Sequence, residues 1–272
     1  MIITSQKEFK DIIKALAKAR KVFLVGCSEC AALCGTGDAK ALEAMKERLE
    51  GQGIVVTGGM IAKTGCQVLG TKTELKGHKD AVDDADVILS MSCGAGAQTI
   101  EELFPQKEVY TANDSLFLGN MSRFRQFDER CSMCGDCVLN ETGGICPVTR
   151  CPKGILNGPC GGVRDGKCEV DPNLDCCFVL IYERLKKIDQ IESFKNIKEP
   201  RDFQHSRKPS KLKVDTRGQA RGYQPSEQRE QEGEAPLALP IEGMTKTASK
   251  ASVEGEAPSG FAGGGGDASP FK

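Results

Sequence analysis

The stretch from residue 131 to residue 177 constrains the fold of this chain most, because it is dense in cysteine and poor in aliphatic side chains. It holds nine of the chain's 14 cysteines. The residues between them are rich in glycine, proline, aspartate and asparagine, as in Asn157-Gly-Pro-Cys-Gly-Gly162, and favour tight turns over helices and strands. Hydrophobic burial cannot organise such a segment. We therefore expect metal-bound thiolates to take the place of a core.

The cysteine spacing narrows the choice of metal. Two CxxC steps in succession join Cys131, Cys134 and Cys137, while Cys146 and Cys151 each precede a proline. This pattern is similar to the bacterial ferredoxin run CxxCxxCxxxCP, although the interval before Cys146 is longer than three residues. Zinc also binds four cysteines in CxxC pairs, so a zinc site remains an alternative to an iron–sulfur cluster. A disulfide scaffold is disfavoured because no export signal is present, and scattered free cysteines are disfavoured by the density.

The overall composition excludes several classes of partner. The chain has 37 Lys and Arg against 38 Asp and Glu, so neither nucleic acid nor an anionic membrane is expected as its main partner. No run approaches the ~18 apolar residues that would span a bilayer. The first residues lack the basic segment and apolar core of an export signal, and we therefore expect a cytoplasmic protein.

Histidine is scarce. The chain has only two, His78 and His205, and both lie far along the sequence from the dense cysteines. A Cys/His zinc finger is therefore not expected, and an all-thiolate site is favoured. Soft thiolate sites suit iron–sulfur clusters or zinc better than magnesium or calcium.

Residues 1 to about 120 have the pattern of a small α/β domain. Short apolar runs alternate with amphipathic segments of helical period, which implies a parallel sheet covered on both faces. The predicted strands are 22–25, 54–57, 87–90 and 108–111, and the predicted helices are 7–19, 38–50 and 97–104.

Five further cysteines fall where this sheet predicts a binding site. Cys27, Cys30 and Cys34 follow the first strand, Cys66 follows the second and Cys93 the third. Ligands of open α/β sheets bind outside the carboxyl ends of the strands. Five thiols therefore compete for the four positions of one cubane cluster, and the alternative for Cys66 or Cys93 is a buried apolar role.

Two glycine-rich turns lie beside these cysteines and begin at Gly35 and Gly94. Neither turn completes the GxGxxG nucleotide fingerprint, so phosphate binding is weakly supported. We expect them instead to let the backbone approach a cluster and donate N–H groups to its sulfurs.

The rest of the chain divides into three pieces. Residues 113–130 are predicted to be a connector whose phenylalanines Phe117, Phe124 and Phe127 dock the two halves. A metal-stapled, loop-rich domain covers 121–198 and ends in an amphipathic helix at 178–188. Residues 199–272 form a low-complexity tail, which we expect to be disordered or bound to a partner.

Several segments carry a family resemblance. In the second half these are Cys131-x-x-Cys134-Gly135-x-Cys137, Thr142-Gly-Gly-Ile-Cys-Pro147, Cys151-Pro-Lys153, Asn157-Gly-Pro-Cys-Gly-Gly162, Lys167-Cys-Glu-Val170 and Cys176-x-x-x-x-Ile181. They closely resemble the cysteine-rich methylenetetrahydrofolate reductase C-terminal family. In the first half, Gly26-Cys27-Ser-Glu-Cys30, Cys34-Gly-Thr-Gly37 and Cys93-Gly-Ala-Gly-Ala-Gln98 are similar to the small, MetV-type subunit of the same reductases. The resemblance covers residues 5 to 190.

The resemblance implies an electron-transfer role in one-carbon metabolism of anaerobes, in the Wood–Ljungdahl pathway. In such reductases a separate TIM-barrel subunit carries FMN and reduces 5,10-methylenetetrahydrofolate to 5-methyltetrahydrofolate. The small subunit passes electrons to it through iron–sulfur clusters. This chain has too few strands for an eight-fold barrel, so the folate chemistry belongs to a partner. The resemblance does not decide the electron donor, and a hydrogenase, a heterodisulfide reductase and an Rnf-like complex are the alternatives.

The family frame aligns eight cysteines of the second half, enough for two four-ligand sites: Cys131, Cys134, Cys137, Cys146, Cys151, Cys160, Cys168 and Cys176. A ferredoxin-like arrangement pairs the first three with a late cysteine such as Cys176. With the first domain, this implies two or three 4Fe–4S clusters. One site could instead bind zinc for folding, and the competing function is a zinc-stapled assembly subunit without electron transfer.

Overall fold

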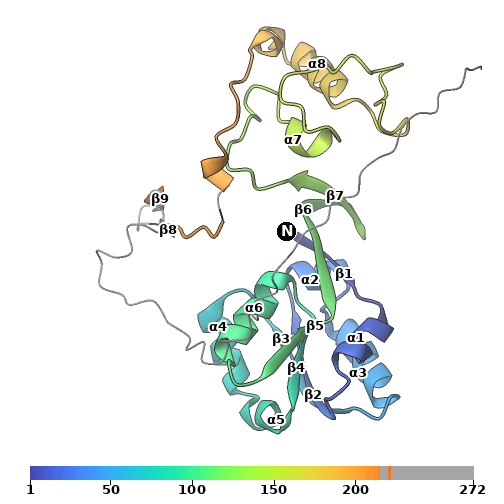
Figure 1. The fold of residues 1–272 in the computed structure, drawn as a ribbon, viewed down its shortest axis with the longest axis vertical. Helices are drawn as coiled ribbons and strands as arrows, with labels where there is room; N and C mark the ends of the chain where they lie inside the picture. The colour runs from blue at the N-terminus through green and yellow to red at the C-terminus, as the bar shows by residue number, and fades with distance from the viewer. Residues whose placement is uncertain (207, 215–219, 222–272) are drawn as a thin grey trace, which may run out of the picture. The chain divides into compact units, whose positions relative to one another are not determined.

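The apolar run at residues 22–25 lies in the middle of a four-stranded parallel sheet (Figure 1). The computed structural model describes residues 1–206, 208–214 and 220–221. The strand order is β3-β2-β4-β5. The strands are β2 (Lys21–Cys27), β3 (Val55–Ala62), β4 (Val87–Ser90) and β5 (Glu108–Thr111). All four sequence-predicted strands are present, and β3 extends well beyond the predicted residue 57.

Helices cover both faces of this sheet because neighbouring side chains of β2 point to opposite sides. Leu24 packs with Ile12 and Met45, whereas Phe23 packs with Leu75 and Ile100. Figure 1 shows α1 and α3 on one side and α4 and α6 on the other. The helices are α1 (Phe9–Ala15), α2 (Cys30–Cys34), α3 (Ala39–Glu50), α4 (Val68–Lys76), α5 (Lys79–Asp84) and α6 (Gly94–Leu103). The predicted α/β architecture is confirmed.

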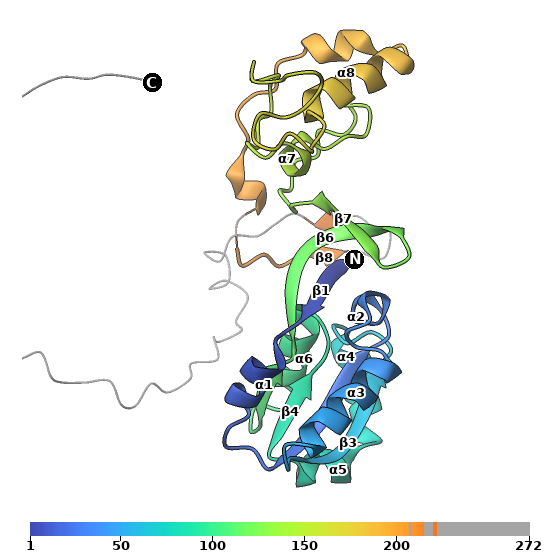
Figure 2. The same ribbon diagram turned by 90° about the vertical axis from the view of Figure 1, so that its right-hand side faces the viewer.

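A second, antiparallel sheet joins the chain's first residues to the segment that follows β5. Its strands are β1 (Ile2–Gln6), β6 (Asn113–Arg123) and β7 (Gln126–Cys131), in the order β1-β6-β7. Figure 2 shows β1 beside β6, where Ile3 pairs with Phe117. The sequence predicted neither β1 nor this hairpin within residues 113–130. Phe124 lies at the hairpin tip and is 83% exposed, so its predicted docking role is wrong.

The cysteine-rich segment has little regular structure. It contains α7 (Pro147–Arg150), α8 (Cys177–Lys187) and the 3-10 helices η1 (Ile191–Lys195) and η2 (Phe203–Ser206). Its small core consists of the buried side chains of Cys176, Cys177, Phe178, Ile181 and Leu185. The amphipathic helix predicted at 178–188 is confirmed as α8.

Met1–Ser210 form one compact unit, and the described residues 211–214 and 220–221 belong to a second. The second contains the strand pair β8 (Lys213–Val214) and β9 (Ala220–Arg221). The rest of the predicted tail, at 215–219 and 222–272, lies outside the described residues.

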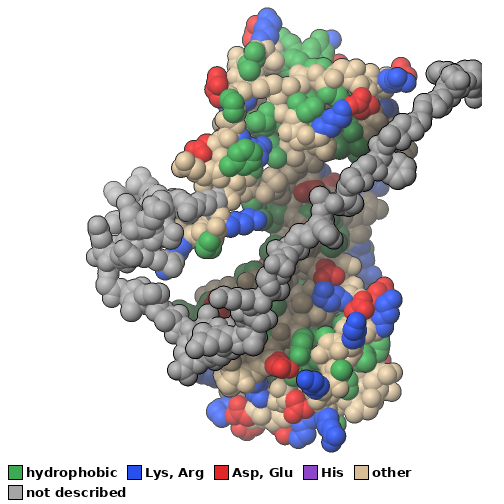
Figure 3. Space-filling model, viewed as in Figure 1, with side chains coloured by type: hydrophobic (Ala, Val, Ile, Leu, Met, Phe, Trp, Pro, Cys, Tyr) green, Lys and Arg blue, Asp and Glu red, His purple; other side chains and the backbone are tan. Residues whose placement is uncertain are grey.

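The parallel-sheet part of the face that Figure 3 draws has no large region of a single charge sign. Figure 3 shows acidic and basic side chains interspersed over the parallel-sheet part of the face that it draws. No helix among the described residues has both the length and the apolar surface needed to cross a bilayer.

Candidate thiol sites

The carboxyl end of the parallel sheet collects cysteines from three connections. Cys27 is the last residue of β2, Cys30 begins α2, and Cys93 caps the amino end of α6 directly after β4. Cys27 and Cys93 are buried, Cys30 is half-buried and Cys66 is exposed. The strand topology therefore places thiols on neighbouring connections, as the sequence predicted.

Backbone N–H groups donate to three of these sulfurs. Gly65 N–H donates to Cys27 Sγ at 3.4 Å, Ile2 N–H to Cys30 Sγ at 3.3 Å and Thr4 N–H to Cys34 Sγ at 3.5 Å. Hydrogen bonds to sulfur favour the thiolate over the thiol and tune a metal centre that the thiolate holds. Sequence reasoning missed these donors, because Ile2 and Thr4 belong to a strand that local pattern did not reveal.

The pKa of Cys66 reports which thiols lie near one another. Partial desolvation raises it above the ordinary thiol value even though the side chain reaches solvent, and the thiols of Cys93, Cys27 and Cys30 raise it further. Like charges oppose ionisation in this way when they share a small volume. Three of the other four predicted cysteines thus act on Cys66, and Cys34 is not among them.

The two glycines expected to face a cluster have other hydrogen-bond partners. Gly35 N–H donates to the carbonyl of Ala32 at 2.9 Å, and Gly94 N–H donates to Ser115 Oγ at 2.9 Å. Their N–H groups are thus engaged in ending α2 and in joining α6 to β6.

A buried polar network lies directly beneath the thiols. Asn113, the first residue of β6, is 2% exposed. Its Nδ2 donates to Ser92 O at 3.2 Å and to Thr36 Oγ1 at 3.3 Å, and Thr36 Oγ1 lies 2.7 Å from Thr4 Oγ1. Thr36 follows Cys34 and Ser92 precedes Cys93, so Asn113 fixes the two cysteine-bearing loops relative to each other.

The Cys131–Cys137 loop turns sharply. Met133 and Gly135 both have positive φ, of 54° and 78°. Met133 N–H donates to Cys131 Sγ at 3.2 Å. A backbone donor on a cysteine two residues earlier is the kind of contact that stabilises a thiolate.

One expectation for this loop was wrong. His205 was expected to be remote from the dense cysteines, yet its backbone packs against Gly135. A Cβ atom added to Gly135 would lie 2.6 Å from His205 O. The separation along the sequence concealed a direct contact.

A second group of thiols surrounds the ends of α7 and the start of α8. Cys146 and Cys151 flank α7, and Cys176 precedes α8. The pKa of Cys177 is raised to about 12, chiefly by burial and also by the thiols of Cys151, Cys176 and Cys146, while Arg150 lowers it. Cys177 is therefore a neutral, buried thiol at physiological pH, and it has Cys146, Cys151 and Cys176 as neighbours.

Cys160 and Cys168 have different surroundings. The Sγ atom of Cys160 lies 3.9 Å from both Lys153 Nζ and Glu169 Oε1, and those two side chains form an ion pair. Cys168 N–H donates to Leu174 O at 2.9 Å within a tight turn.

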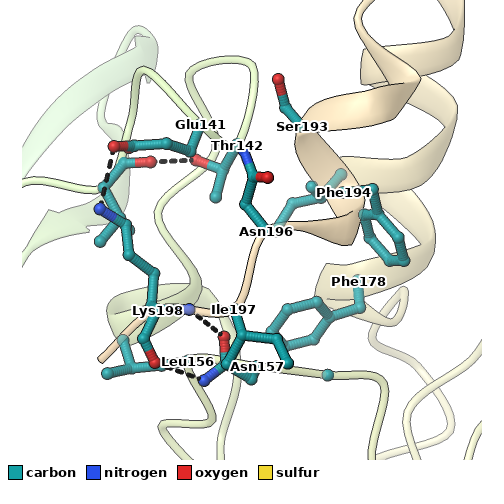
Figure 4. Close-up of a pocket in the computed structure, with 13 residues that line it drawn as sticks. Glu141, Thr142, Leu156, Asn157, Phe178, Ser193, Phe194, Asn196, Ile197 and Lys198 are labelled. Atoms are coloured by element: carbon teal, nitrogen blue, oxygen red, sulfur yellow. Dashed lines mark hydrogen bonds and ion pairs between the residues drawn. The ribbon is translucent and has the colours of Figure 1, made fainter. Parts of the chain in front are cut away.

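The Asn157–Gly162 motif organises a cavity of about 120 Å³ (Figure 4). Phe178 and Phe194 contribute apolar walls, and Glu141 and Lys198 contribute a charged edge. Lys198 Nζ lies 2.9 Å from Glu141 Oε1, as a dashed line in Figure 4 marks. A Cβ on Gly158 would lie 2.6 Å from the Phe178 ring, so this glycine is needed for the ring to pack.

The described side chains are not already arranged in the geometry of a metal site. Among residues 1–206, 208–214 and 220–221, no three His, Cys, Asp or Glu side chains converge closely enough to hold a metal ion. The donor chemistry is nonetheless that of soft-metal sites, because the candidate ligands are thiols and backbone N–H groups donate to the sulfurs of Cys27 and Cys131.

Comparison with known proteins bears on the second half. Residues 110–204 match the model of the family described as methylene-tetrahydrofolate reductase C terminal. This part of the chain is similar to that family. No curated protein and no solved structure matches the chain. The matched residues contain β6, β7, α7, α8 and all nine cysteines of the dense stretch.

Proposed function

We propose that this chain is the iron–sulfur electron-transfer subunit of a methylenetetrahydrofolate reductase complex, of the small MetV type. The observation that carries the proposal is the gathering of thiols at two places, beside a family match to the reductase C-terminal domain. Soft, thiolate-rich donor sets favour iron–sulfur clusters or zinc.

In the first half, Cys27, Cys30, Cys66 and Cys93 are the ligand set that we propose. Cys34 is left out because it is not among the thiols that raise the pKa of Cys66, which are Cys93, Cys27 and Cys30. Gly65 N–H and Ile2 N–H would stabilise the charge on Cys27 and Cys30.

In the second half, Cys146, Cys151 and Cys176 are proposed to serve one centre, and Cys131, Cys134 and Cys137 another. Cys177 is left out of the ligand set because the family frame aligns Cys176 and leaves Cys177 as the adjacent extra thiol. Cys160 or Cys168 is proposed to complete the centre of Cys146, Cys151 and Cys176. The family frame groups both of these cysteines with Cys146 and Cys151.

Clusters held by thiolates carry one electron at a time, and a flavin on a partner subunit converts single electrons into hydride chemistry. The role of this chain is therefore to hold such centres in a protein interior and to dock on the partner. The barrel subunit, with its FMN and the folate site, is proposed as that partner, because the described strands form a four-stranded open sheet and two smaller sheets.

Paired cysteine variants test the ligand assignment. In full-length protein purified without oxygen, Cys66→Ala should lose one cluster, about four iron atoms per chain, whereas Cys34→Ala should keep its iron. Cys176→Ala should lose iron and Cys177→Ala should not. Equal losses within each pair would contradict the assignment.

Electron transfer needs its own test. The dithionite-reduced chain, freed of excess reductant, should bleach the flavin of a methylenetetrahydrofolate reductase barrel subunit on anaerobic mixing. Cys66→Ala should slow this bleaching. A chain that contains zinc alone and leaves the flavin oxidised would show that it is a structural subunit.

A further inference from the structure

The turn Cys134-Gly135-Asp136-Cys137 lies against η2. A Cβ atom on Gly135 would be 2.6 Å from His205 O and 2.7 Å from His205 Cβ. Any other residue at position 135 would have to move η2 away, and the positive φ of 78° disfavours a side chain there independently. The imidazole of His205 is therefore attached beside the backbone that links Cys134 to Cys137.

The segment that carries His205 is fixed to the same part of the chain at its other end. Asn157 holds the backbone of Lys198 through two hydrogen bonds of 2.8 Å. The ion pair with Glu141 raises the pKa of Lys198, and the charge of Asp136 raises it further. The segment from Lys198 to His205 is therefore held at both ends, at Lys198 by Asn157 and Glu141 and at His205 by Gly135.

The cysteine loop needs a fourth ligand, and His205 competes for that position with whichever of Cys160 and Cys168 the other centre leaves free. Cys131, Cys134 and Cys137 supply three thiols, while zinc sites and cubane clusters take four protein ligands. Cys176, the late cysteine that a ferredoxin-like crossover would use, lies in the small core against which Cys151 packs. His78, the chain's other histidine, packs near Phe23 with ring centroids 5.9 Å apart.

We infer that His205 supplies, through an imidazole nitrogen, the fourth protein ligand of a metal centre held by Cys131, Cys134 and Cys137. The inference rests on the proposed function only in requiring a metal at this loop, and it holds for a cubane cluster or for zinc.

The surroundings of His205 fit a ligand. Metal-binding histidines usually donate their second ring N–H to a carboxylate. Asp202 Oδ2 lies 3.7 Å from His205 Nε2, and Asp202 Oδ1 accepts from Gln204 N–H at 2.9 Å, which fixes the carboxylate at the start of η2. The His205 side chain is 59% exposed, so turning the ring toward the loop needs no repacking of a core.

A histidine ligand would make this centre differ from an all-thiolate one. A neutral imidazole in place of an anionic thiolate leaves less negative charge on the centre, and histidine ligation raises the reduction potential of iron–sulfur centres. The loop centre should therefore accept electrons more readily than an otherwise similar centre with four cysteines.

The test uses full-length protein grown with isotope-labelled histidine and purified without oxygen. Pulsed electron paramagnetic resonance of the reduced protein should detect a directly bound nitrogen whose coupling changes with the isotope. His78→Ala, which removes the other histidine, should keep this signal, and His205→Ala should abolish it.

His205→Cys separates ligation from a structural role. A cysteine at this position should retain the iron, lose the histidine-nitrogen coupling and shift the potential of one cluster to a more negative value. A residue that served only packing would leave the potential unchanged in a variant that keeps its iron.

If the loop binds zinc, X-ray absorption reports the same ligand. His205→Ala should then remove a zinc–nitrogen distance of about 2.0–2.1 Å and leave zinc–sulfur distances of about 2.3 Å. This result would end the iron assignment of the loop while supporting His205. Iron-loaded protein without histidine coupling, or coupling that survives His205→Ala, overturns the inference and leaves the proposed function standing. Protein that binds neither metal overturns both.

Discussion

The side-chain amide of Asn157 and the main chain of Lys198 are joined by a pair of hydrogen bonds. Asn157 Nδ2 donates to Lys198 O, and Lys198 N–H donates to Asn157 Oδ1, both at 2.8 Å. An amide side chain is suited to this because it offers one donor and one acceptor to one residue's backbone. The motif Asn157–Gly162 thus begins with the residue that holds the segment leading to η2.

Asn157→Ala should loosen this segment. Two hydrogen bonds at a partly exposed position are worth about 1–2 kcal/mol together. Hydrogen exchange should show faster exchange of the amides from 196 to 206, with α3 unchanged. Exchange that accelerates equally in α3 would mean that the variant unfolds globally.

The Glu141–Lys198 ion pair should make the stability of the fold depend on pH in the acid range. The hydrogen bond from Lys198 lowers the pKa of Glu141 from its ordinary value of 4.5. A lowered pKa means that the folded chain favours the carboxylate. The ion pair's contribution to stability is therefore complete above the ordinary value of 4.5 and is lost as pH falls through the lowered pKa of the folded chain.

Glu141→Gln removes the titrating group. The difference in Tm between the original chain and this variant should therefore be present at neutral pH and shrink below pH 4.5. Other acid-sensitive groups are common to both proteins and cancel in the difference. A difference that grows with acid would contradict this reading of the pair.

Gly135→Ala should displace η2. The added Cβ meets the backbone of His205, and overpacking of this kind costs about 1–3 kcal/mol beyond the strain of the positive φ. Gly144→Ala is the matched control, since Gly144 has a φ of +87° and no atom within 4 Å of an added Cβ. Thermal unfolding and hydrogen exchange at 203–206 should separate the two, and equal effects would show that the contact with His205 is unimportant.

Asn113→Asp should destabilise the first thiol site. A carboxylate in place of the amide would face the carbonyl of Ser92 and the Thr36 oxygens in a buried position, at a cost on the order of 3 kcal/mol. Asn120→Asp, on the exposed part of the same strand, keeps its acceptor for Arg130 Nε and should be nearly neutral. Chemical denaturation of both variants measures the difference.

The sequence predicted the parts of the fold that depend on local period. α3 begins one residue after its cap Asp38 and buries Leu42, Met45 and Leu49. β5 has the predicted bounds, because a short apolar run between turns has few alternatives to a strand. The predicted grouping of Cys27, Cys30 and Cys93 followed from strand topology alone.

The parts that local pattern could not predict depend on long-range contacts. β1 is only five residues long and becomes a strand by pairing with β6 more than a hundred residues later. The contact between Gly135 and His205 likewise joins residues 70 positions apart. The N–H donors of Ile2 and Thr4 to sulfur follow from β1 and were hidden with it.

The metal content of the full-length chain, purified without oxygen, tests the central claim most directly. We expect about eight to twelve iron atoms per chain with an equal amount of sulfide, as two or three cubane clusters require. Zinc alone, or protein without iron and sulfide, would contradict the electron-transfer role.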